Sequence, residues 1–452
     1  MQRPEGVEER SVDPGAVSST AGLGGSARSG GVFETTTDYV RHPRPVTWLN
    51  ALGPVLERVG ALPPLEVEAV MAAARRKTRL EDFGDEWFRE PLGVLLDSLK
   101  REARLTPLGH WIQHARIVGA LVNRLRAEEM VRRSPEILDL ELGPVVVIAG
   151  LQRTGTTLLH RLLSADPEMR SLAAWEAISP VPWPGERAGQ PIGRVRRARF
   201  AARALAYLAP QFFAIHPAEH DAPEEDVLLL DLSFMSQAPE ATLHVPSYAK
   251  WLEGGDHTRA YQYLRRAMQI LLAQRGGRRW VLKSPNHLEH LDVVLDMFPE
   301  ARIVQTHRDP QKTMPSFCSM VAHARGIFSD DVDPHEVARH WVRKVDRLLE
   351  RSSRVRADRA DGRFLDVSYY DLAADPIAEA ERVCDFAGLT LSDVARQAMT
   401  AAREHNVQHK HGRHRYSLGD FGLCEEDIER AFGDYRTRFS IPFESGAGAP
   451  IH

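Results

Sequence analysis

The pattern of apolar and polar positions divides the chain into three parts. Residues 1 to about 36 are rich in Gly, Ser, Thr and Glu and poor in large apolar side chains, which predicts a disordered tail. In residues 37–140 apolar positions recur at helical spacing with charges between them, so we expect a helical N-terminal extension. In residues 141–452 short β-branched runs alternate with helical stretches, which predicts an α/β domain with a doubly wound, mainly parallel sheet.

Four short apolar runs are the expected strands of that sheet, and they cover residues 145–148, 279–283, 301–307 and 363–369. A polar turn and then a helical stretch follow each run, and this alternation is typical of parallel strands. The carboxyl ends of parallel strands meet at one edge of the sheet, where such folds bind their ligands. Polar residues that directly follow these runs are therefore the first candidates for function.

A glycine-bounded turn, GLQRTGTT, joins the first run to a helical stretch and covers residues 150–157. Such a turn directs several backbone N–H groups and the positive end of a helix dipole to one point, which suits a phosphate. The spacing is that of a nucleotide-binding P-loop, except that Thr156 stands at the position of the usual lysine. Arg153 lies inside the turn and could supply the positive charge in its place.

Composition limits the class of partner and the compartment. The chain has 58 basic and 62 acidic residues, so we expect no nucleic-acid partner and look for a local anion site. Three cysteines without a CxxC pair favour a reducing, cytoplasmic location. No apolar run is long enough to form a transmembrane segment, and no N-terminal apolar run suggests a signal peptide. Peripheral contact with a membrane surface is compatible with this composition.

The turn and its helix, GLQRTGTTLLHRLL, resemble the 5′-phosphosulfate-binding loop of sulfotransferases that use 3′-phosphoadenylyl sulfate (PAPS), and the bacterial sulfotransferase-like group in particular. The resemblance extends over about residues 140–440 and implies a P-loop fold of the sulfotransferase type. It implies PAPS as co-substrate, no metal, and in-line transfer of the sulfuryl group to a hydroxyl of a small-molecule, lipid or glycan acceptor. The residues that it implies for the 5′-phosphosulfate are Arg153, Thr154, Gly155, Thr156 and Thr157.

Three further motifs match the same family. RDPQKTMPS is similar to the motif whose Arg and Ser hold the 3′-phosphate of PAPS, which implies Arg308 and Ser316. Lys283 ends the second strand, where the family has a lysine that stabilises the bridging oxygen of the leaving group. KHGRHRYS is similar to the basic C-terminal loop that closes over the 3′-phosphate, which implies Lys410 and Arg413. The resemblance therefore implies catalytic roles for Lys283 and Arg153.

The acceptor hydroxyl also needs a base to take its proton. Glu176 follows the P-loop helix, where some relatives have a glutamate as the proposed base, and we expect this carboxylate to act. The animal cytosolic enzymes use a histidine, so His216, His220 and His287 are the alternatives.

Two polar clusters have other interpretations. The acidic segment 219–226 predicts the start of a helix, because acidic residues favour helix N-termini. Four histidines between positions 405 and 414 lack the carboxylate or thiolate partners of a metal site, and the cations among them suit a phosphate better.

Two alternative functions are a P-loop kinase or NTPase and a non-catalytic nucleotide-binding scaffold. A kinase or NTPase predicts a lysine in the loop and a carboxylate at a strand end for Mg²⁺, whereas Thr156 and Arg308 occupy those places. A scaffold would not need Lys283 or a base. One departure from the family pattern is Leu158, which stands where the cytosolic enzymes have an aromatic side chain that stacks on adenine. The sequence does not identify the residues that contact adenine.

Overall fold

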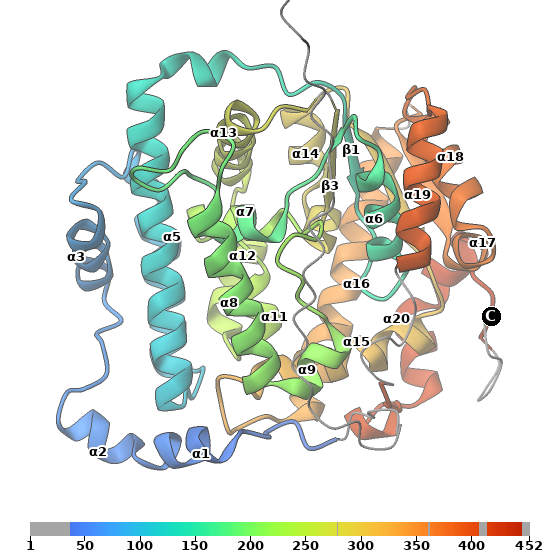
Figure 1. Cartoon of the computed structure of the whole chain (residues 1–452). Helices are drawn as coiled ribbons and strands as arrows, with labels where there is room; N and C mark the ends of the chain where they lie inside the picture. Colours follow the sequence, from blue (N-terminus) through green and yellow to red (C-terminus); the bar gives the residue numbers. More distant parts are fainter. Residues whose placement is uncertain (1–36, 278, 360–361, 406–413, 445–452) are drawn as a thin grey trace, which may run out of the picture.

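A sheet of five parallel strands in the order β2-β3-β1-β4-β5 lies within a helical shell (Figure 1). The computed structural model describes residues 37–277, 279–359, 362–405 and 414–444. The strands are β1 (Val145–Ile148), β2 (Met169–Arg170), β3 (Arg279–Lys283), β4 (Arg302–His307) and β5 (Phe364–Ser368). The predicted doubly wound parallel sheet is therefore confirmed, with every predicted strand present. Strand β2 was not predicted, because two residues are too few to show a periodic pattern.

The central strand β1 pairs with β3 on one side and with β4 on the other. Ile148 at its end lies opposite Lys283 of β3 and Val304 of β4. Strands β2 and β3 thus lie on one side of β1, and β4 and β5 lie on the other. Such a change in the direction of strand addition leaves a crevice at the carboxyl ends of the strands. The segments that follow β1, β3 and β4 all leave the sheet at that edge.

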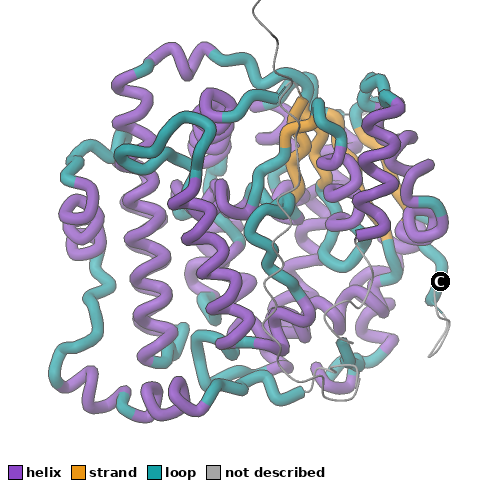
Figure 2. Tube along the Cα trace, in the orientation of Figure 1, coloured by secondary structure: helices purple, strands orange, loops and turns teal. Residues whose placement is uncertain are grey.

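Successive residues of β1 contribute to two different hydrophobic cores, because side chains of a strand alternate between the faces of a sheet. Val146 and Ile148 pack against Leu159 and Leu163 of α6 (Thr156–Ala165), with α18 (Pro376–Phe386) and α19 (Asp393–His405) around them. Val147 faces the larger core on the opposite side. Figure 2 shows the strands enclosed by helices, so both faces are buried and the β-branched run is explained.

The N-terminal helices complete the larger core. They are α1 (Arg44–Ala51), α2 (Gly53–Arg58), α3 (Val67–Thr78), η1 (Glu86–Phe88), α4 (Arg89–Arg101), α5 (Pro107–Arg133) and η2 (Pro135–Asp139). Phe88, Leu92 and Leu121 from these helices belong to the same apolar cluster as Trp280 of β3 and Ile303 of β4. The predicted tail, residues 1–36, lies outside the described residues.

The remaining helices connect and cover the strands. Between β2 and β3 lie α7 (Ala174–Ile178), α8 (Ile192–Leu208), α9 (Pro210–Ile215), α10 (Val227–Leu230), η3 (Asp231–Ser233), α11 (Ala238–Thr242), α12 (Pro246–Gly254) and α13 (Thr258–Gln274). The later ones are η4 (Pro285–Glu289), α14 (Leu291–Met297), α15 (Pro310–Arg325), α16 (Pro334–Asp358), α17 (Tyr369–Ala374), η5 (Gly419–Phe421) and α20 (Glu425–Arg438). Across the described ranges we find no helix whose length and hydropathy would suit a membrane span.

Candidate functional site

The turn after β1 has the tight backbone of an anion-binding loop. Gly155 has a φ of 91° and Arg153 a φ of 69°, a left-handed conformation that a non-glycine residue rarely adopts. A Cβ atom on Gly150 would overlap the hydroxyl of Thr306, so no side chain fits there. Helix α6 starts directly after Gly155, and the free N–H groups of its first turn lie at the mouth of the loop.

Hydroxyls inside the loop have different surroundings. Thr154 is fully buried, and its Oγ1 lies 2.6 Å from the carbonyl oxygen of Leu151 and 2.5 Å from Oγ1 of Thr306. This side chain fixes the loop to β4, so a contact of Thr154 with an anion would come from its backbone. Thr156 is buried in the first turn of α6, and Thr157 is exposed.

The structure brings Arg153, Arg308 and Ser316 together, although β1, β4 and α15 supply them. Arg153 donates from Nε to Oγ of Ser316 at 3.0 Å, and Arg308 donates from Nη1 to the carbonyl oxygen of Arg153 at 3.2 Å. Burial lowers the pKa of Arg153, Tyr416 opposes this shift and the neighbouring Arg308 adds to it. Two cations at this distance repel each other, and a bound anion would relieve the repulsion.

Lys283 lies on the other side of the loop, at the end of β3. Its side chain is 6% exposed, and Nζ donates to Oε1 of Glu225 at 2.7 Å. The backbone N–H of Lys283 donates to Oδ1 of Asp226 at 2.9 Å, which holds the strand end in place. Because Ile148 and Lys283 are register partners, this ammonium lies beside the start of the P-loop.

Residues near the C-terminus cover Arg308. The carboxylate of Glu444 accepts from Nε and Nη2 of Arg308 at 2.7 and 3.1 Å, and it accepts from the Tyr370 hydroxyl at 3.2 Å. The Arg308 guanidinium also lies 3.9 Å from the ring centroid of Tyr369. Tyr369 reaches the loop as well, since a Cβ on Gly155 would lie 3.2 Å from its ring.

The carboxylate of Glu176 is occupied by structural partners. It is 1% exposed and accepts from Nη1 and Nη2 of Arg170 at 2.9 and 2.8 Å. It also accepts from Arg275 at 3.1 Å and from the backbone N–H of Ala173 at 3.0 Å. These contacts join β2, α7 and the end of α13. Since both oxygens already accept hydrogen bonds from arginines, the geometry does not favour Glu176 as the base.

The three histidine alternatives have different environments. His287 is fully buried between the Tyr261 hydroxyl at 2.9 Å and Asp226 at 2.8 Å. Nε2 of His220 lies 3.2 Å from Nη2 of Arg199, in the middle of α8. Both rings therefore have partners away from the loop.

His216 directly follows α9, within the electrostatic influence of Lys283 and Arg153. The residue is exposed at the surface, yet protein groups surround its ring closely enough to desolvate it. Burial lowers the pKa of this imidazole, the carboxylates of Glu224 and Glu225 oppose the shift, and Lys283 and Arg153 add to it. The lowered pKa favours a neutral imidazole with an acceptor nitrogen at neutral pH.

Lys410 and Arg413 lie outside the described residues. The described end of the same segment reaches the site through His414, whose Nε2 lies 2.8 Å from Oγ of Ser319 in α15. Burial and the neighbouring Arg153 lower the pKa of His414 to about 3. His414, the first described residue after that loop, therefore lies near Arg153.

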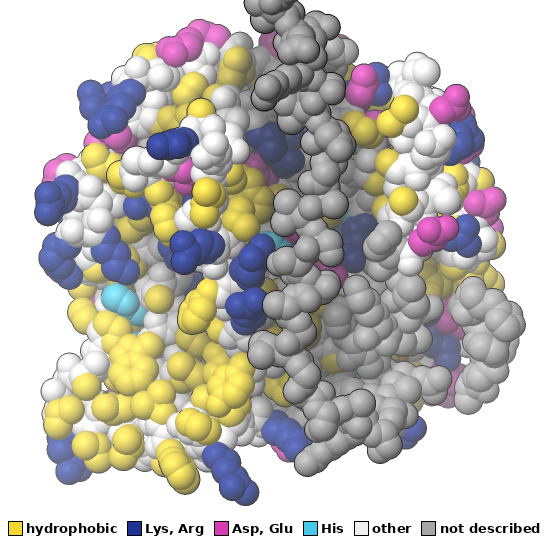
Figure 3. All heavy atoms as spheres, in the orientation of Figure 1, with side chains coloured by type: hydrophobic (Ala, Val, Ile, Leu, Met, Phe, Trp, Pro, Cys, Tyr) yellow, Lys and Arg dark blue, Asp and Glu magenta, His cyan; other side chains and the backbone are white. Residues whose placement is uncertain are grey.

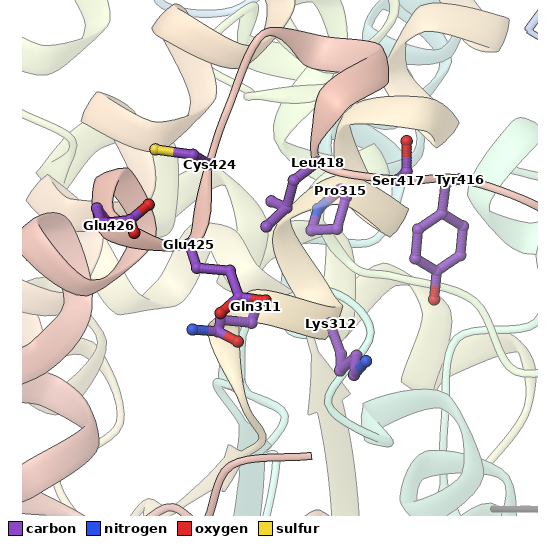
Figure 4. Close-up of a pocket in the computed structure, with 9 residues that line it drawn as sticks. All are labelled: Gln311, Lys312, Pro315, Tyr416, Ser417, Leu418, Cys424, Glu425 and Glu426. Carbon is purple, nitrogen blue, oxygen red and sulfur yellow. The ribbon is translucent and has the colours of Figure 1, made fainter. Parts of the chain in front are cut away.

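A hollow of about 490 Å³ opens between α15 and the segment that leads to α20. Lys312 and Tyr416 lie on one side of it, and Cys424, Glu425 and Glu426 lie on the other (Figure 4). Charges of both signs line this hollow, so it is not a simple anion site. Within the described part of the chain, no cluster of three His, Cys, Asp or Glu side chains could hold a metal ion.

Comparison with known proteins decides which family this site belongs to. The model of the sulfotransferase family matches residues 144–393. The chain belongs to the sulfotransferase family. This membership confirms the resemblance of the P-loop and supports sulfuryl transfer in general, in preference to the kinase or NTPase alternative.

Solved structures of two mycobacterial sulfotransferases resemble this sulfotransferase. STF1 from Mycobacterium tuberculosis H37Rv is 36% identical, with a TM-score of 0.69 over 81% of this chain and 98% of STF1. STF9 from Mycobacterium avium is 26% identical, with a TM-score of 0.77 over 85% of this chain and 99% of STF9. Omega-hydroxy-beta-dihydromenaquinone-9 sulfotransferase Stf3 of Mycobacterium bovis is 24% identical over 264 residues. That match spans 54% of this sulfotransferase and 63% of Stf3.

Several residues of the site were not predicted from the sequence. Tyr369 directly follows β5, so the strand-end rule that selected Lys283 and Arg308 could have found it. Glu225 lies in the acidic segment that was interpreted as a helix start, and α10 does begin there, after Asp226. No sequence signal pairs Glu225 with Lys283 or Glu444 with Arg308.

Proposed function

We propose that this sulfotransferase takes the sulfuryl group from PAPS and transfers it in line to a hydroxyl of a small-molecule, lipid or glycan acceptor. The observation that carries the proposal is the set of three cations, Lys283, Arg153 and Arg308, around a P-loop without the usual lysine. Lys283 ends β3, whereas Arg153 and Arg308 follow β1 and β4, and these three strands are adjacent in the sheet. Cations on both sides of one loop suit a nucleotide with separate anionic groups at its 5′ and 3′ positions.

Each residue then has a chemical role. The N–H groups of the loop from Arg153 to Thr157 hold the 5′-phosphosulfate, and Arg308 and Ser316 hold the 3′-phosphate. PAPS supplies a sulfuryl group on an anhydride oxygen that leaves with PAP (3′-phosphoadenosine 5′-phosphate). Lys283 stabilises the charge that develops on this bridging oxygen. Lys410 and Arg413 stay in the proposal as further ligands of the 3′-phosphate.

We propose His216, in place of Glu176, as the group that takes the proton of the acceptor hydroxyl. Its exposure and its lowered pKa, to which Lys283 and Arg153 contribute, support this role, because a neutral imidazole accepts a proton at physiological pH. As the acceptor oxygen bonds to sulfur, the bond from sulfur to the bridging oxygen breaks, and the hydroxyl proton passes to His216. Glu225 accepts a hydrogen bond from Nζ of Lys283 and holds that side chain in place.

A lipid alcohol is the acceptor class that we favour. The relative Stf3 acts, by its name, on an omega-hydroxy dihydromenaquinone. We therefore propose a primary hydroxyl on a long apolar chain.

The donor and the acceptor are tested separately. Calorimetric titration should show binding of PAP without magnesium, weaker binding of 5′-AMP, and no preference for ATP with magnesium. Labelled PAPS with a panel of long-chain alcohols, phenols and glycans should then transfer label to an alcohol. Tight binding of ATP with magnesium in place of PAP would reject the donor, and PAP binding without transfer to any acceptor would favour a non-catalytic scaffold.

A further inference from the structure

Helices α1 and α2 expose an apolar surface at one end of the molecule. Trp48 is 72% exposed, and Leu52, Val55 and Val59 are also more than half exposed. Figure 1 shows the two helices lying along the lower end of α5, at the periphery of the fold. Exposed apolar side chains that follow one another along one short helical segment are typical of an interaction surface.

Helix α8 carries the same combination of apolar and basic side chains. Phe200 is 74% exposed and Tyr207 is 59% exposed, and they lie seven residues apart, on one face of the helix. Arg196 and Arg203 are exposed on the same face. Helices α1, α2 and α8 together contain seven arginines, of which Arg194 is buried and paired with Glu186, and Glu57 is the single acidic residue of the three helices.

The two surfaces adjoin each other. Gln211, which follows α8, donates from Nε2 to the carbonyl oxygen of Asp38, which precedes α1. A small hollow is lined by Asp38, Tyr39 and Arg41 together with residues 208–212, so the segment that leads into α1 lies next to the end of α8. Figure 3 shows hydrophobic side chains gathered over α1, α2 and the lower ends of the neighbouring helices, with Lys and Arg at their edges.

We propose that the outward faces of α1, α2 and α8, here called the basic-apolar face, dock onto a lipid bilayer that contains anionic lipids. Tryptophan and tyrosine favour the headgroup region, and arginines interleaved with apolar residues pair with lipid phosphates. A protein partner fits less well, because it would have to neutralise several arginines that have few acidic neighbours on this face.

The location of this face suggests a functional reason for the docking. Helix α9 starts two residues after the end of α8, has six residues and ends at Ile215, directly before His216, so it spans about 9 Å. A lipid alcohol that leaves a bilayer at Tyr207 would therefore have a short path to the proposed base. This functional reason, delivery of a lipid alcohol to the base, rests on the proposed function, whereas the docking itself does not.

Co-sedimentation with vesicles tests the docking. The full chain should pellet with vesicles of phosphatidylcholine and phosphatidylglycerol, pellet weakly with phosphatidylcholine alone, and dissociate as salt is raised. The double variant Trp48→Ser/Leu52→Ser and the double variant Arg196→Gln/Arg203→Gln should each bind about tenfold more weakly. The matched controls are Val394→Ser, an apolar residue 63% exposed on α19, and Arg430→Gln on α20, and both should bind as wild type.

Two measurements separate this proposal from the proposed function. Binding of PAP and transfer to a water-soluble short-chain alcohol should be unchanged in the double variants. Turnover of a vesicle-embedded alcohol should fall in parallel with vesicle binding. Equal pelleting of the wild type with and without phosphatidylglycerol, or wild-type pelleting of both double variants, would overturn the docking. A concentration-dependent dimer in sedimentation velocity that is lost in Trp48→Ser/Leu52→Ser would instead assign the face to a second copy and would also overturn it.

Discussion

The carboxylate of Glu444 pairs with the guanidinium of Arg308 through two hydrogen bonds, from Nε at 2.7 Å and from Nη2 at 3.1 Å. The backbone N–H of Glu444 donates to Oδ2 of Asp309 at 2.8 Å, which anchors the residue in this position. Arg308 is our proposed ligand of the 3′-phosphate. The two oxygens of Glu444 therefore occupy the donors that this phosphate would use.

We predict that Glu444→Gln tightens the binding of PAP by about tenfold, because a charged competitor leaves Arg308 while the shape of the side chain is kept. The binding of 5′-AMP, which has no 3′-phosphate, should change little. Calorimetric titration of both nucleotides measures this difference. Glu426→Gln removes a carboxylate on the far side of the neighbouring hollow and serves as the control. Equal gains for PAP and 5′-AMP would place the 3′-phosphate away from Arg308.

Lys283→Ala should lower kcat by about 10²–10³-fold while the affinity for PAP stays within about threefold. The reason is that the ammonium would stabilise charge that appears on the bridging oxygen during transfer. Single-turnover transfer and calorimetry measure the two quantities separately. Lys312→Ala, a lysine in the first turn of α15, is the control and should keep kcat. A large loss of PAP affinity with normal kcat would contradict the role of Lys283 in catalysis.

His216→Gln should abolish most turnover and leave PAP binding intact. A base acts when it is neutral, and the pKa of His216 is lowered below the ordinary histidine value by burial and by the nearby cations. The wild-type kcat/KM should therefore rise with pH through an acid limb below pH ~6.5 and be level above it. The variant should lose this limb. An unchanged limb in the variant would mean that another group takes the proton.

Glu176→Gln should lower the stability of the fold. The carboxylate is buried with Arg170, so removing its charge leaves an arginine buried without its counter-ion. We expect the free energy of unfolding to fall by about 3 kcal/mol, measured by urea denaturation. Glu381→Gln, at the surface pair with Arg396, should change it by less than ~1 kcal/mol. A Glu176→Gln protein with wild-type stability and no turnover would return Glu176 to the role of base.

The fold and the ligand-binding edge could be predicted because their signals are local. Val145 to Ile148 form a buried strand whose side chains alternate between two cores, so the unbroken run of apolar residues reflects burial on both faces of the sheet. A Cβ on Gly150 would overlap the Thr306 hydroxyl, so this position of the loop requires glycine. Lys283 and Arg308 were found because each ends or follows a predicted strand.

Partners of the site residues could not be predicted in the same way. Glu176 looks like a free acid in the sequence, yet Arg170 and Arg275 approach it from β2 and from the end of α13. Lys283 meets Glu225 from a segment 58 residues away, and Arg308 meets Glu444 from 136 residues away. Such pairs depend on how helices pack over the sheet, and no periodic pattern encodes them.

The sequence by itself determined the fold class, the anion-binding loop and the family, because backbone geometry and hydrophobic periodicity act over a few neighbouring residues. Tertiary structure alone decided which charged groups are available for chemistry. It buried Glu176 between arginines and left His216 exposed within the electrostatic influence of Lys283, since the charge environment of a side chain is set by groups that are distant along the chain.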